Sequence, residues 1–482
     1  MNLSSDEILI NYLNEKIIAN SFLCQKYTIF NNTKLHHRNI FEKIIGYLDD
    51  FLSKDTYHRM ITIPGLRGVG KTTLLFQIYD YLIQKGIEPN RILYLNTEDL
   101  MKIPNANILN ACEIFIKDIN DAYPFSNEKL IILIDESQND SNWAKYAKII
   151  YDEYPNVFTI FTGSNTLNME LTADTVRRNK KIAMYPLKFS EYLYLKENIK
   201  IPDIEENINK ILLTGDLNNL KQIETDLYLN EFSKINQNPK KIWKEYMKFG
   251  GFAYGLNLKK EDIVETTMSI VDKTIEKDMK LLLDMKKDTE LTAKRMINLI
   301  ASQKPGDLSE NKISEILNVS TSQVKNILSI FEKTHIIFHL EAYGSASKKS
   351  RKSWKYNFLS PTLKYAINKN YGNMEMKESE IMGLLSEDLV ASRLFLNKYY
   401  KKTFNVYYEA CKRGVDYLLK FNENNGNVII PVEVGYGKKS LKQVYRSIDR
   451  NNSPYGILIS NKTSMLMKRD NVICMPLLLF SL

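Results

Sequence analysis

The stretch from Met60 to Gln77 constrains the fold of this chain most. A short apolar run, Met60–Ile63, leads into Gly-Leu-Arg-Gly-Val-Gly-Lys-Thr at positions 65–72, and an apolar-periodic helix is expected from Thr73 onward. This is the spacing of a P-loop in its strand–loop–helix context. The glycines let the backbone curl so that successive N–H groups point toward phosphate oxygens, and the helix dipole adds positive potential. The pattern predicts a nucleoside triphosphate site.

The P-loop pattern assigns a role to each of its residues. Lys71 is expected to reach the β and γ phosphates, and Thr72 to hold Mg²⁺. The predicted contacts with the nucleotide come from Gly65, Gly68, Val69, Gly70, Lys71, Thr72 and Thr73. ATP and Mg²⁺ are therefore the expected ligands.

Two further apolar runs follow the P-loop helix, at residues 91–96 and 130–134. Continuous apolar runs that alternate with helices are typical of a parallel sheet buried on both faces. The second run continues into Asp135 and Glu136, where α/β sheets place their ligand sites. Asp135 would bind Mg²⁺ through water or Thr72, and Glu136 would orient and polarise the attacking water. This Walker B pattern predicts ATP hydrolysis.

The next strand, residues 157–162, is followed by polar residues that could touch the γ-phosphate. Ser164 or Asn165 is a candidate sensor, although Ser and Asn side chains also stabilise plain turns. Arg177 and Arg178 could project into a neighbouring subunit's nucleotide and stabilise transition-state charge. A solvated arginine pair is the alternative. A homo-oligomer is predicted only if one of these arginines reaches the nucleotide of a neighbouring subunit.

An apolar stripe precedes the first strand and predicts a lead-in helix packed on the ATPase core. The stripe consists of Ile40, Ile44, Ile45, Leu48 and Leu52. Arg38, just before it, could approach the base or ribose of the nucleotide. A solvated or salt-bridged arginine is the alternative.

The length of 482 residues is too great for one core and suggests about three domains. The net charge of +9 permits nucleic-acid binding without requiring it. The four cysteines lie far apart, which excludes a recognisable zinc or disulfide framework. Asp6 and Glu7 stand where a signal peptide would carry cations, and no apolar run approaches the ~18 residues of a membrane span. We therefore expect a cytoplasmic protein without a membrane partner.

The pattern between residues 309 and 358 predicts a winged helix. Two short helices flank a polar turn at 318–320, and a strand, a basic loop at 344–355 and a return strand follow. Such modules bind DNA or serve only in packing. A DNA-binding version would use Ser320, Thr321, Ser322, Gln323 and Lys325 in the major groove and Lys348, Lys349, Arg351, Lys352 and Lys355 in the wing.

Taken together, the motifs resemble the prokaryotic AAA+-type ATPases of the archaeal ATPase group. The resemblance rests on residues 65–72, Asp135-Glu136-Ser137-Gln138, Phe161–Ser164 and Tyr185–Tyr192. It extends over nearly the whole chain and includes Gly250–Tyr254, where Ala253 replaces the proline of the family. It implies ATP binding and hydrolysis, and a C-terminal domain of unknown function related to PD-(D/E)xK nucleases.

The resemblance also implies a second metal site. Three residues match the acidic positions of the nuclease pattern: Glu387, Asp416 and Glu433. In that pattern, carboxylates at strand ends gather a divalent metal and a lysine helps the nucleophilic water. Gly435 stands at the lysine position here, and Lys438 or Lys439 could substitute. A fold that binds without cutting and an active nuclease both remain open.

The predicted fold class is α/β, with a parallel P-loop NTPase sheet, a helical lid, a winged helix and a restriction-endonuclease-like domain. The predicted boundaries are 1–194 for the ATPase core with its N-terminal helices, 195–288 for the lid, 289–370 for the winged helix and 371–482 for the nuclease-like domain. The predicted function is an AAA+-type switch or remodelling ATPase that acts on nucleic acid or a partner protein. The alternative is an ATP-gated, metal-dependent DNA nuclease, for example in defence against foreign DNA.

Overall fold

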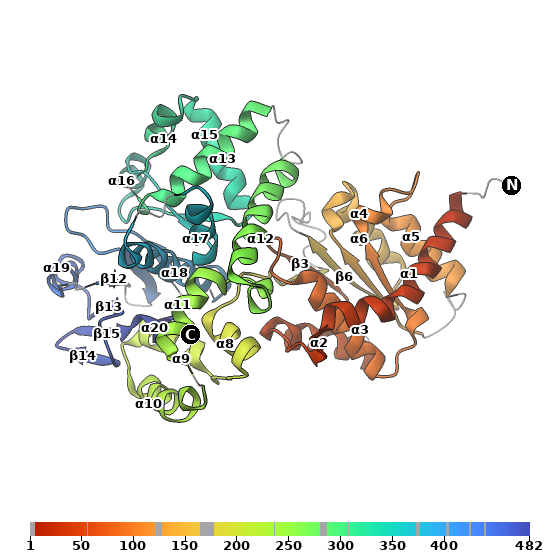
Figure 1. The fold of residues 1–482 in the computed structure, drawn as a ribbon, viewed down its shortest axis with the longest axis horizontal. Coiled ribbons are helices and arrows are strands. Elements are labelled where there is room, and N and C mark those ends of the chain that lie inside the picture. The colour runs from red at the N-terminus through yellow and green to blue at the C-terminus, as the bar shows by residue number, and fades with distance from the viewer. Residues whose placement is uncertain are drawn as a thin grey trace. The chain divides into compact units, whose positions relative to one another are not determined.

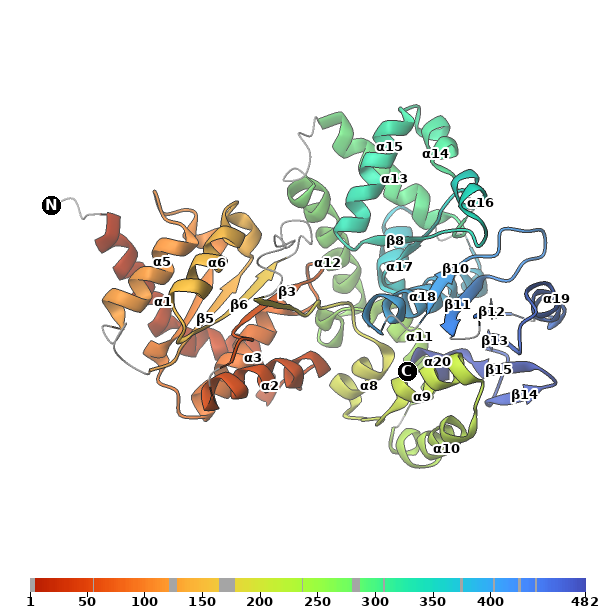
Figure 2. The same ribbon diagram turned by 180° about the vertical axis from the view of Figure 1, so that it is seen from behind.

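The chain forms two compact units, Met1–Tyr185 and Pro186–Leu482. The computed structural model describes residues 5–54, 56–120, 128–163, 178–235, 237–279, 287–306, 308–372, 376–401, 404–423, 426–437 and 440–482. Figures 1 and 2 show the ribbon from opposite sides.

The first unit is built on a five-stranded parallel sheet in the order β4-β5-β6-β3-β7. Its strands are β3 (Met60–Pro64), β4 (Ile92–Asn96), β5 (Leu130–Asp135), β6 (Val157–Gly163) and β7 (Asn179–Lys181). Every residue of β3, β5 and β6 is buried, because helices cover both faces of the sheet. The parallel α/β core predicted from the apolar runs is confirmed.

The helices of the first unit lie on both sides of this sheet, with α2 and α3 on one side and α6 on the other (Figures 1 and 2). They are α1 (Ser5–Thr28), α2 (Asn39–Ser53), α3 (Lys71–Gln84), α4 (Thr97–Leu100), α5 (Ile108–Ile114) and α6 (Trp143–Glu153). A two-stranded ribbon, β1 (Ile29–Phe30) with β2 (Thr33–Lys34), links α1 to α2.

Helix α2 is the predicted lead-in helix, but its buried face is rotated slightly from the expected stripe. Ile44, Ile45 and Leu48 are buried as predicted, together with Phe41 and Phe51. Ile40 and Leu52 are only partly buried, so the prediction was wrong at the two ends of the stripe. The larger aromatic side chains occupy the core positions there and bury more apolar area.

The second unit begins with helices that pack on its C-terminal part. They are α8 (Phe189–Glu197), α9 (Ile204–Thr214), α10 (Asn218–Asp226), α11 (Pro239–Phe249), α12 (Lys260–Lys273) and α13 (Lys287–Ser302). Tyr455 donates a hydrogen bond to the Leu212 carbonyl at 3.0 Å, and the Asn397 and Asn209 side chains meet at 2.7 Å. Residues 186–288 thus share a compact unit with the end of the chain.

Three helices and a hairpin form the middle of the second unit. Helices α14 (Glu310–Leu317) and α15 (Thr321–Lys333) follow α13, and strand β8 (Ile337–Leu340) pairs antiparallel with β9 (Lys355–Phe358). The turn between the helices has local causes. Ser309 and Ser320 cap the N-termini of the two helices, and Asn318 ends α14 in the left-handed conformation at φ 53°.

One expectation about the hairpin was wrong. Residues 344–355 were predicted to be a basic loop, but they contain helix α16 (Ala346–Arg351). Lys349 forms an ion pair with Glu341 at 2.9 Å from within this helix. Helical residues with long side chains keep most of their rotamer freedom, so a lysine- and arginine-rich run forms a helical turn readily.

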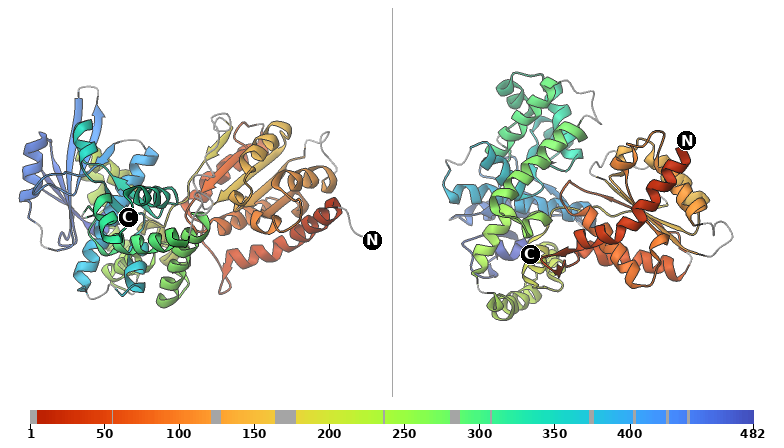
Figure 3. Two further views of the ribbon diagram at one scale, coloured as in Figure 1. Left: turned by 90° about the horizontal axis from the view of Figure 1, so that it is seen from above. Right: turned by 45° about the vertical axis from the view of Figure 1, so that its right-hand side comes forward.

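The C-terminal part holds a six-stranded mixed sheet in the order β10-β11-β12-β13-β15-β14, seen in blue in the left view of Figure 3. Its strands are β10 (Asn405–Tyr407), β11 (Tyr417–Glu423), β12 (Gly426–Gly435), β13 (Gly456–Ser460), β14 (Met467–Arg469) and β15 (Val472–Pro476). The accompanying helices are α17 (Pro361–Asn370), α18 (Glu378–Lys401), α19 (Lys442–Asn451) and α20 (Leu477–Ser481).

Among the described helices, none combines the length and the apolar character that a membrane span requires.

Candidate nucleotide-binding site

Glycines shape the loop between β3 and α3. The Gly65 N–H donates to the Gly163 carbonyl at 3.1 Å, and a Cβ at position 65 would lie 2.3 Å from the Met184 carbonyl oxygen. Gly68 and Gly70 have φ values of 79° and 99°, which other residues rarely adopt. The loop can therefore curl as the P-loop pattern predicts.

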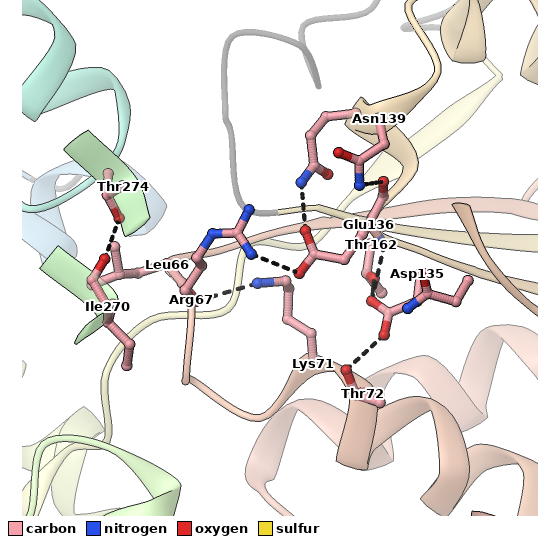
Figure 4. A network of polar contacts seen from close by, with 12 residues as sticks. Leu66, Arg67, Lys71, Thr72, Asp135, Glu136, Asn139, Thr162, Ile270 and Thr274 are labelled. Atoms are coloured by element: carbon pink, nitrogen blue, oxygen red, sulfur yellow. Dashed lines mark hydrogen bonds and ion pairs between the residues drawn. The ribbon is translucent and has the colours of Figure 1, made fainter. Parts of the chain in front are cut away.

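Lys71 lies inside this curl. Its side chain is 5% exposed, and the ammonium donates to the carbonyls of Gly65 at 2.8 Å and Leu66 at 3.2 Å (Figure 4). The first turn of α3 starts at this residue, so its positive end faces the same space. Arg38 also supports the loop, because its guanidinium donates to the Val69 carbonyl at 3.0 Å. This loop contact was not among the roles considered for Arg38 from the sequence.

The Asp135 carboxylate accepts hydrogen bonds from three hydroxyl groups. Thr72 donates to Oδ2 at 2.6 Å, Tyr94 donates to the same oxygen at 3.3 Å, and Thr162 donates to Oδ1. Asp135 is 1% exposed, and burial raises its pKa above the ordinary value, with the charge of Glu136 acting in the same direction. The hydroxyl donors and the Lys71 ammonium oppose this rise because they favour the carboxylate.

Glu136 has an unusual backbone and three close partners. Its φ of 53° lies in the left-handed region, which costs a non-glycine residue free energy and is often found at functional sites. Its N–H donates to Asp135 Oδ1 at 3.1 Å, its Oε1 lies 3.7 Å from Arg67 Nη1, and its Oε2 accepts from Gln138 (Figure 4). The carboxylate therefore faces the P-loop.

The residues around Thr72 and Asp135 fit a magnesium ion. A hydroxyl and a carboxylate are the hard oxygen donors that Mg²⁺ prefers, and they already lie within hydrogen-bond distance of each other at the end of the P-loop. The buried carboxylate with a raised pKa would also gain most from a divalent cation.

The strand order explains why Thr162 takes part. Strand β6 lies between the P-loop strand β3 and the Asp135 strand β5, so its last residues stand between the two motifs. Thr162 and Arg67 were not predicted from the sequence to belong to the site. A polar residue near the end of an apolar strand, and a cation inside the P-loop, are the signals that could have identified them.

The other predicted residues of this site have different outcomes. Ser164, Asn165 and Arg177 lie outside the described residues. Arg178 pairs with Asp152 of the same unit, with Nε 2.8 Å from Oδ1. The sensor and finger roles therefore stay predictions.

The residues predicted to contact DNA lie on α15 and near α16. The Ser320 hydroxyl accepts from the Gln323 N–H at 3.1 Å, Ser322 is exposed, and exposed Lys325 lies 3.6 Å from Glu310. Thr321 contacts Ser314 at 3.4 Å. Arg351 donates to the Ser347 carbonyl at 3.1 Å, and Lys352 is exposed. The side chain of Lys348 is not among those that the structure describes.

The three predicted nuclease carboxylates lie near Tyr417, and the charge of each raises the pKa of that residue. The Asp416 N–H donates to Glu433 at 3.2 Å, and the Tyr417 hydroxyl donates to the Glu387 carbonyl at 3.1 Å. Burial raises the pKa of Glu387, and it raises that of Tyr417 well above the ordinary value. Lys355 Nζ, from β9, lies 4.0 Å from Asp416 Oδ1, whereas Lys438 and Lys439 are outside the described residues.

Comparison with known proteins places the P-loop in a named domain. Residues 57–193 match the model of an AAA domain, and residues 240–372 match a domain of unknown function. The second match does not cover the C-terminal sheet, so the relation to nucleases gains no support from it.

The relatives include archaeal and bacterial proteins. The Methanocaldococcus jannaschii protein MJ1637, described as uncharacterised, is 32% identical over 433 residues, which is 89% of this chain and 85% of that protein. An uncharacterised Haemophilus influenzae protein is 27% identical over 353 residues, or 70% of this chain and 76% of that protein. The structure of the Aeropyrum pernix Orc1 protein in complex with DNA aligns with 72% of this chain and 96% of its own, at 12% identity and a TM-score of 0.31. The chain belongs to the family of MJ1637 and carries an AAA domain.

Proposed function

We propose that this protein is an ATP-binding and ATP-hydrolysing AAA+-type switch or remodelling ATPase of the cytoplasm. The observation that carries the proposal is the hydrogen bond from the Thr72 hydroxyl to Asp135 at 2.6 Å. It lies at the end of the P-loop, where the buried Lys71 ammonium donates to the Gly65 carbonyl. A P-loop serine or threonine and a Walker B aspartate jointly hold Mg²⁺ in P-loop NTPases. When bound, the ion would neutralise charge on the ATP phosphates.

In this proposal, the residues of the site act on ATP as follows. Lys71 leaves the carbonyls of Gly65 and Leu66 and donates to phosphate oxygens, which are stronger acceptors because they are charged. Arg67 faces the same phosphates from the loop. Glu136, released from part of its contact with Arg67, orients the water that attacks the γ-phosphate.

Replacement of Lys71 tests the binding step. Lys71→Ala is expected to weaken ATP binding by about 10- to 150-fold, because hydrogen bonds to charged groups contribute ~1.5–3 kcal/mol. The measurement is a titration with a fluorescent ATP analogue. Lys85→Ala, which changes an exposed lysine just after the same helix, should bind like the wild type. Unchanged affinity in Lys71→Ala would contradict the assignment of the P-loop.

We further propose that helices α13 to α15 with the β8–β9 hairpin act as a winged helix, and that the C-terminal sheet is a degenerate nuclease-like fold. The proposed partner is nucleic acid, and the division into the four predicted domains stays a proposal. Three helices followed by an antiparallel hairpin support the first assignment. An arginine finger and a homo-oligomer also remain proposals.

The alternative of an ATP-gated nuclease is less well supported. In the described parts of the chain, no group of three His, Cys, Asp or Glu side chains is arranged to hold a metal ion. Lys355 Nζ lies 4.0 Å from Asp416 Oδ1, so one of the three carboxylates already has a cationic partner. We propose that the carboxylates and this lysine form an internal ion-pair cluster.

This proposal predicts no metal-dependent cleavage. Supercoiled plasmid incubated with the protein, ATP and Mg²⁺ or Mn²⁺ should remain intact, because the cluster lacks a lysine at position 435 and Asp416 already has Lys355 as a cationic partner. Asp416→Ala should behave like the wild type on a gel. Cleavage by the wild type that disappears in Asp416→Ala would favour the nuclease.

A further inference from the structure

A pocket of about 580 Å³ opens between helices α14 and α15 and the segment that leads from α16 into β9. Its size is within the range of small-ligand sites. Lys325, Leu328, Ser329 and Glu332 reach it from one face of α15, and Trp354 and Tyr356 reach it from the hairpin. The exposed face of the second helix and the hairpin thus line one common space.

Trp354 distinguishes this pocket from an ordinary surface depression. Its side chain is 36% exposed, whereas Trp143 and Trp243, the other tryptophans of the chain, are 2% and 4% exposed. Its ring stacks on His339 with centroids 3.7 Å apart and planes at 5°. A large aromatic ring, stacked on His339, is therefore accessible to solvent at the pocket wall, although burial of such a ring is usually favourable.

The charges of the wall favour a polyanion. It carries four basic side chains against two acidic ones: Lys325, Lys349, Arg351 and Lys352 against Glu310 and Glu332. Both acids have partners within the wall or behind it. Glu310 accepts from Tyr356 at 3.2 Å and lies 3.6 Å from Lys325, and Glu332 contacts His339. Lys349 is paired in turn with Glu341 at 2.9 Å, so the positive excess of the wall rests on Arg351 and Lys352.

We propose that this pocket binds an unpaired strand of nucleic acid, with a base stacked on Trp354 and phosphates near Arg351 and Lys352. A positive groove with aromatic platforms is how proteins bind single strands without reading their sequence. In a duplex, both faces of an internal base are covered by its neighbours, so a duplex offers only its two end pairs to a protein ring, whereas every base of a single strand can stack. The inference rests on the proposed function where it names the partner class, but it requires no step of ATP turnover.

The test compares a labelled single strand of about 15 thymidine nucleotides with a blunt duplex of the same length, using the full chain and fluorescence anisotropy. The single strand should bind more tightly and quench tryptophan emission. Trp354→Ala should weaken single-strand binding by about 5- to 150-fold, the equivalent of one base–aromatic stack. Trp354→Phe, which keeps an aromatic ring over His339, should recover most of the affinity.

Lysine variants test the electrostatic part. Lys352→Ala should reduce the slope of log affinity against log salt by about 0.7, as expected for one phosphate contact with a single strand. Lys462→Ala, an exposed lysine of the same unit that does not line the pocket, should leave the slope unchanged.

The outcomes separate this inference from the proposed ATPase. Single-strand binding should survive Lys71→Ala, and ATP binding should survive Trp354→Ala. Because ATP binds in the first unit, circular dichroism and a wild-type urea midpoint are used to show that the second unit of Trp354→Ala is folded. Equal affinity for the single strand and the duplex, or unchanged affinity in folded Trp354→Ala, would overturn the inference and leave the ATPase proposal intact. Absence of ATP binding and hydrolysis in the wild type, with single-strand binding present, would overturn the ATPase proposal and leave this inference intact.

Discussion

Glu136→Gln is expected to lower the rate of ATP hydrolysis by about 10²- to 10⁴-fold while ATP still binds, because a positioned general base contributes rate enhancement of that size. The side chain follows strand β5, faces the P-loop and lies 3.7 Å from Arg67. Glutamine has nearly the same shape, so the water can still be held, but the amide does not polarise it as a carboxylate does. The measurement is phosphate release at saturating ATP, together with an ATP-binding titration.

A matched control is available in the same unit. Glu153→Gln changes an exposed glutamate at the end of α6 and should hydrolyse ATP at the wild-type rate. Retained binding with lost turnover in Glu136→Gln would separate the chemical step from the binding step tested by Lys71→Ala. Equal turnover in the wild type and Glu136→Gln would mean that another residue orients the water.

Lys364→Met is expected to destabilise the second unit by about 3–5 kcal/mol. Lys364 Nζ lies 3.1 Å from Asp388 Oδ2, and both side chains are almost fully buried, at 1% and 0% exposure. Removal of the lysine leaves the Asp388 carboxylate without its cation in a low-dielectric interior. Burial already raises the pKa of Asp388, and the Lys364 ammonium is the strongest influence that opposes this rise.

Urea unfolding followed by circular dichroism measures this loss. Lys369→Met, at an exposed position of the same helix, is the control and should unfold like the wild type. The double variant Lys364→Met/Asp388→Leu should regain part of the stability, because both charges are then absent. It should not regain all of it, since the Phe358 N–H loses Asp388 as its acceptor at 3.1 Å. An unchanged urea midpoint in Lys364→Met would show that this ion pair contributes little.

The sequence by itself determined the features that depend on short-range order. The P-loop and its flanking strand and helix occupy neighbouring positions, so glycine placement and apolar periodicity were sufficient to predict them. The same holds for the turn between α14 and α15, where Ser309, Asn318 and Ser320 act on backbone groups within a few residues. Asp135 was recognised because a buried strand ends there.

Only the tertiary structure decided which distant residues meet. The order β4-β5-β6-β3-β7 brings Thr162 to Asp135, and the fold of the loop brings Arg67 to Glu136. In the second unit, Lys355 approaches Asp416 from a different sheet, and Trp354 reaches the pocket beside Lys325. Local propensity and periodicity carry no information on these contacts, because they arise from packing between segments that are tens of residues apart. Side-chain partners across strands and elements are set by that packing, and with them the electrostatics of each site.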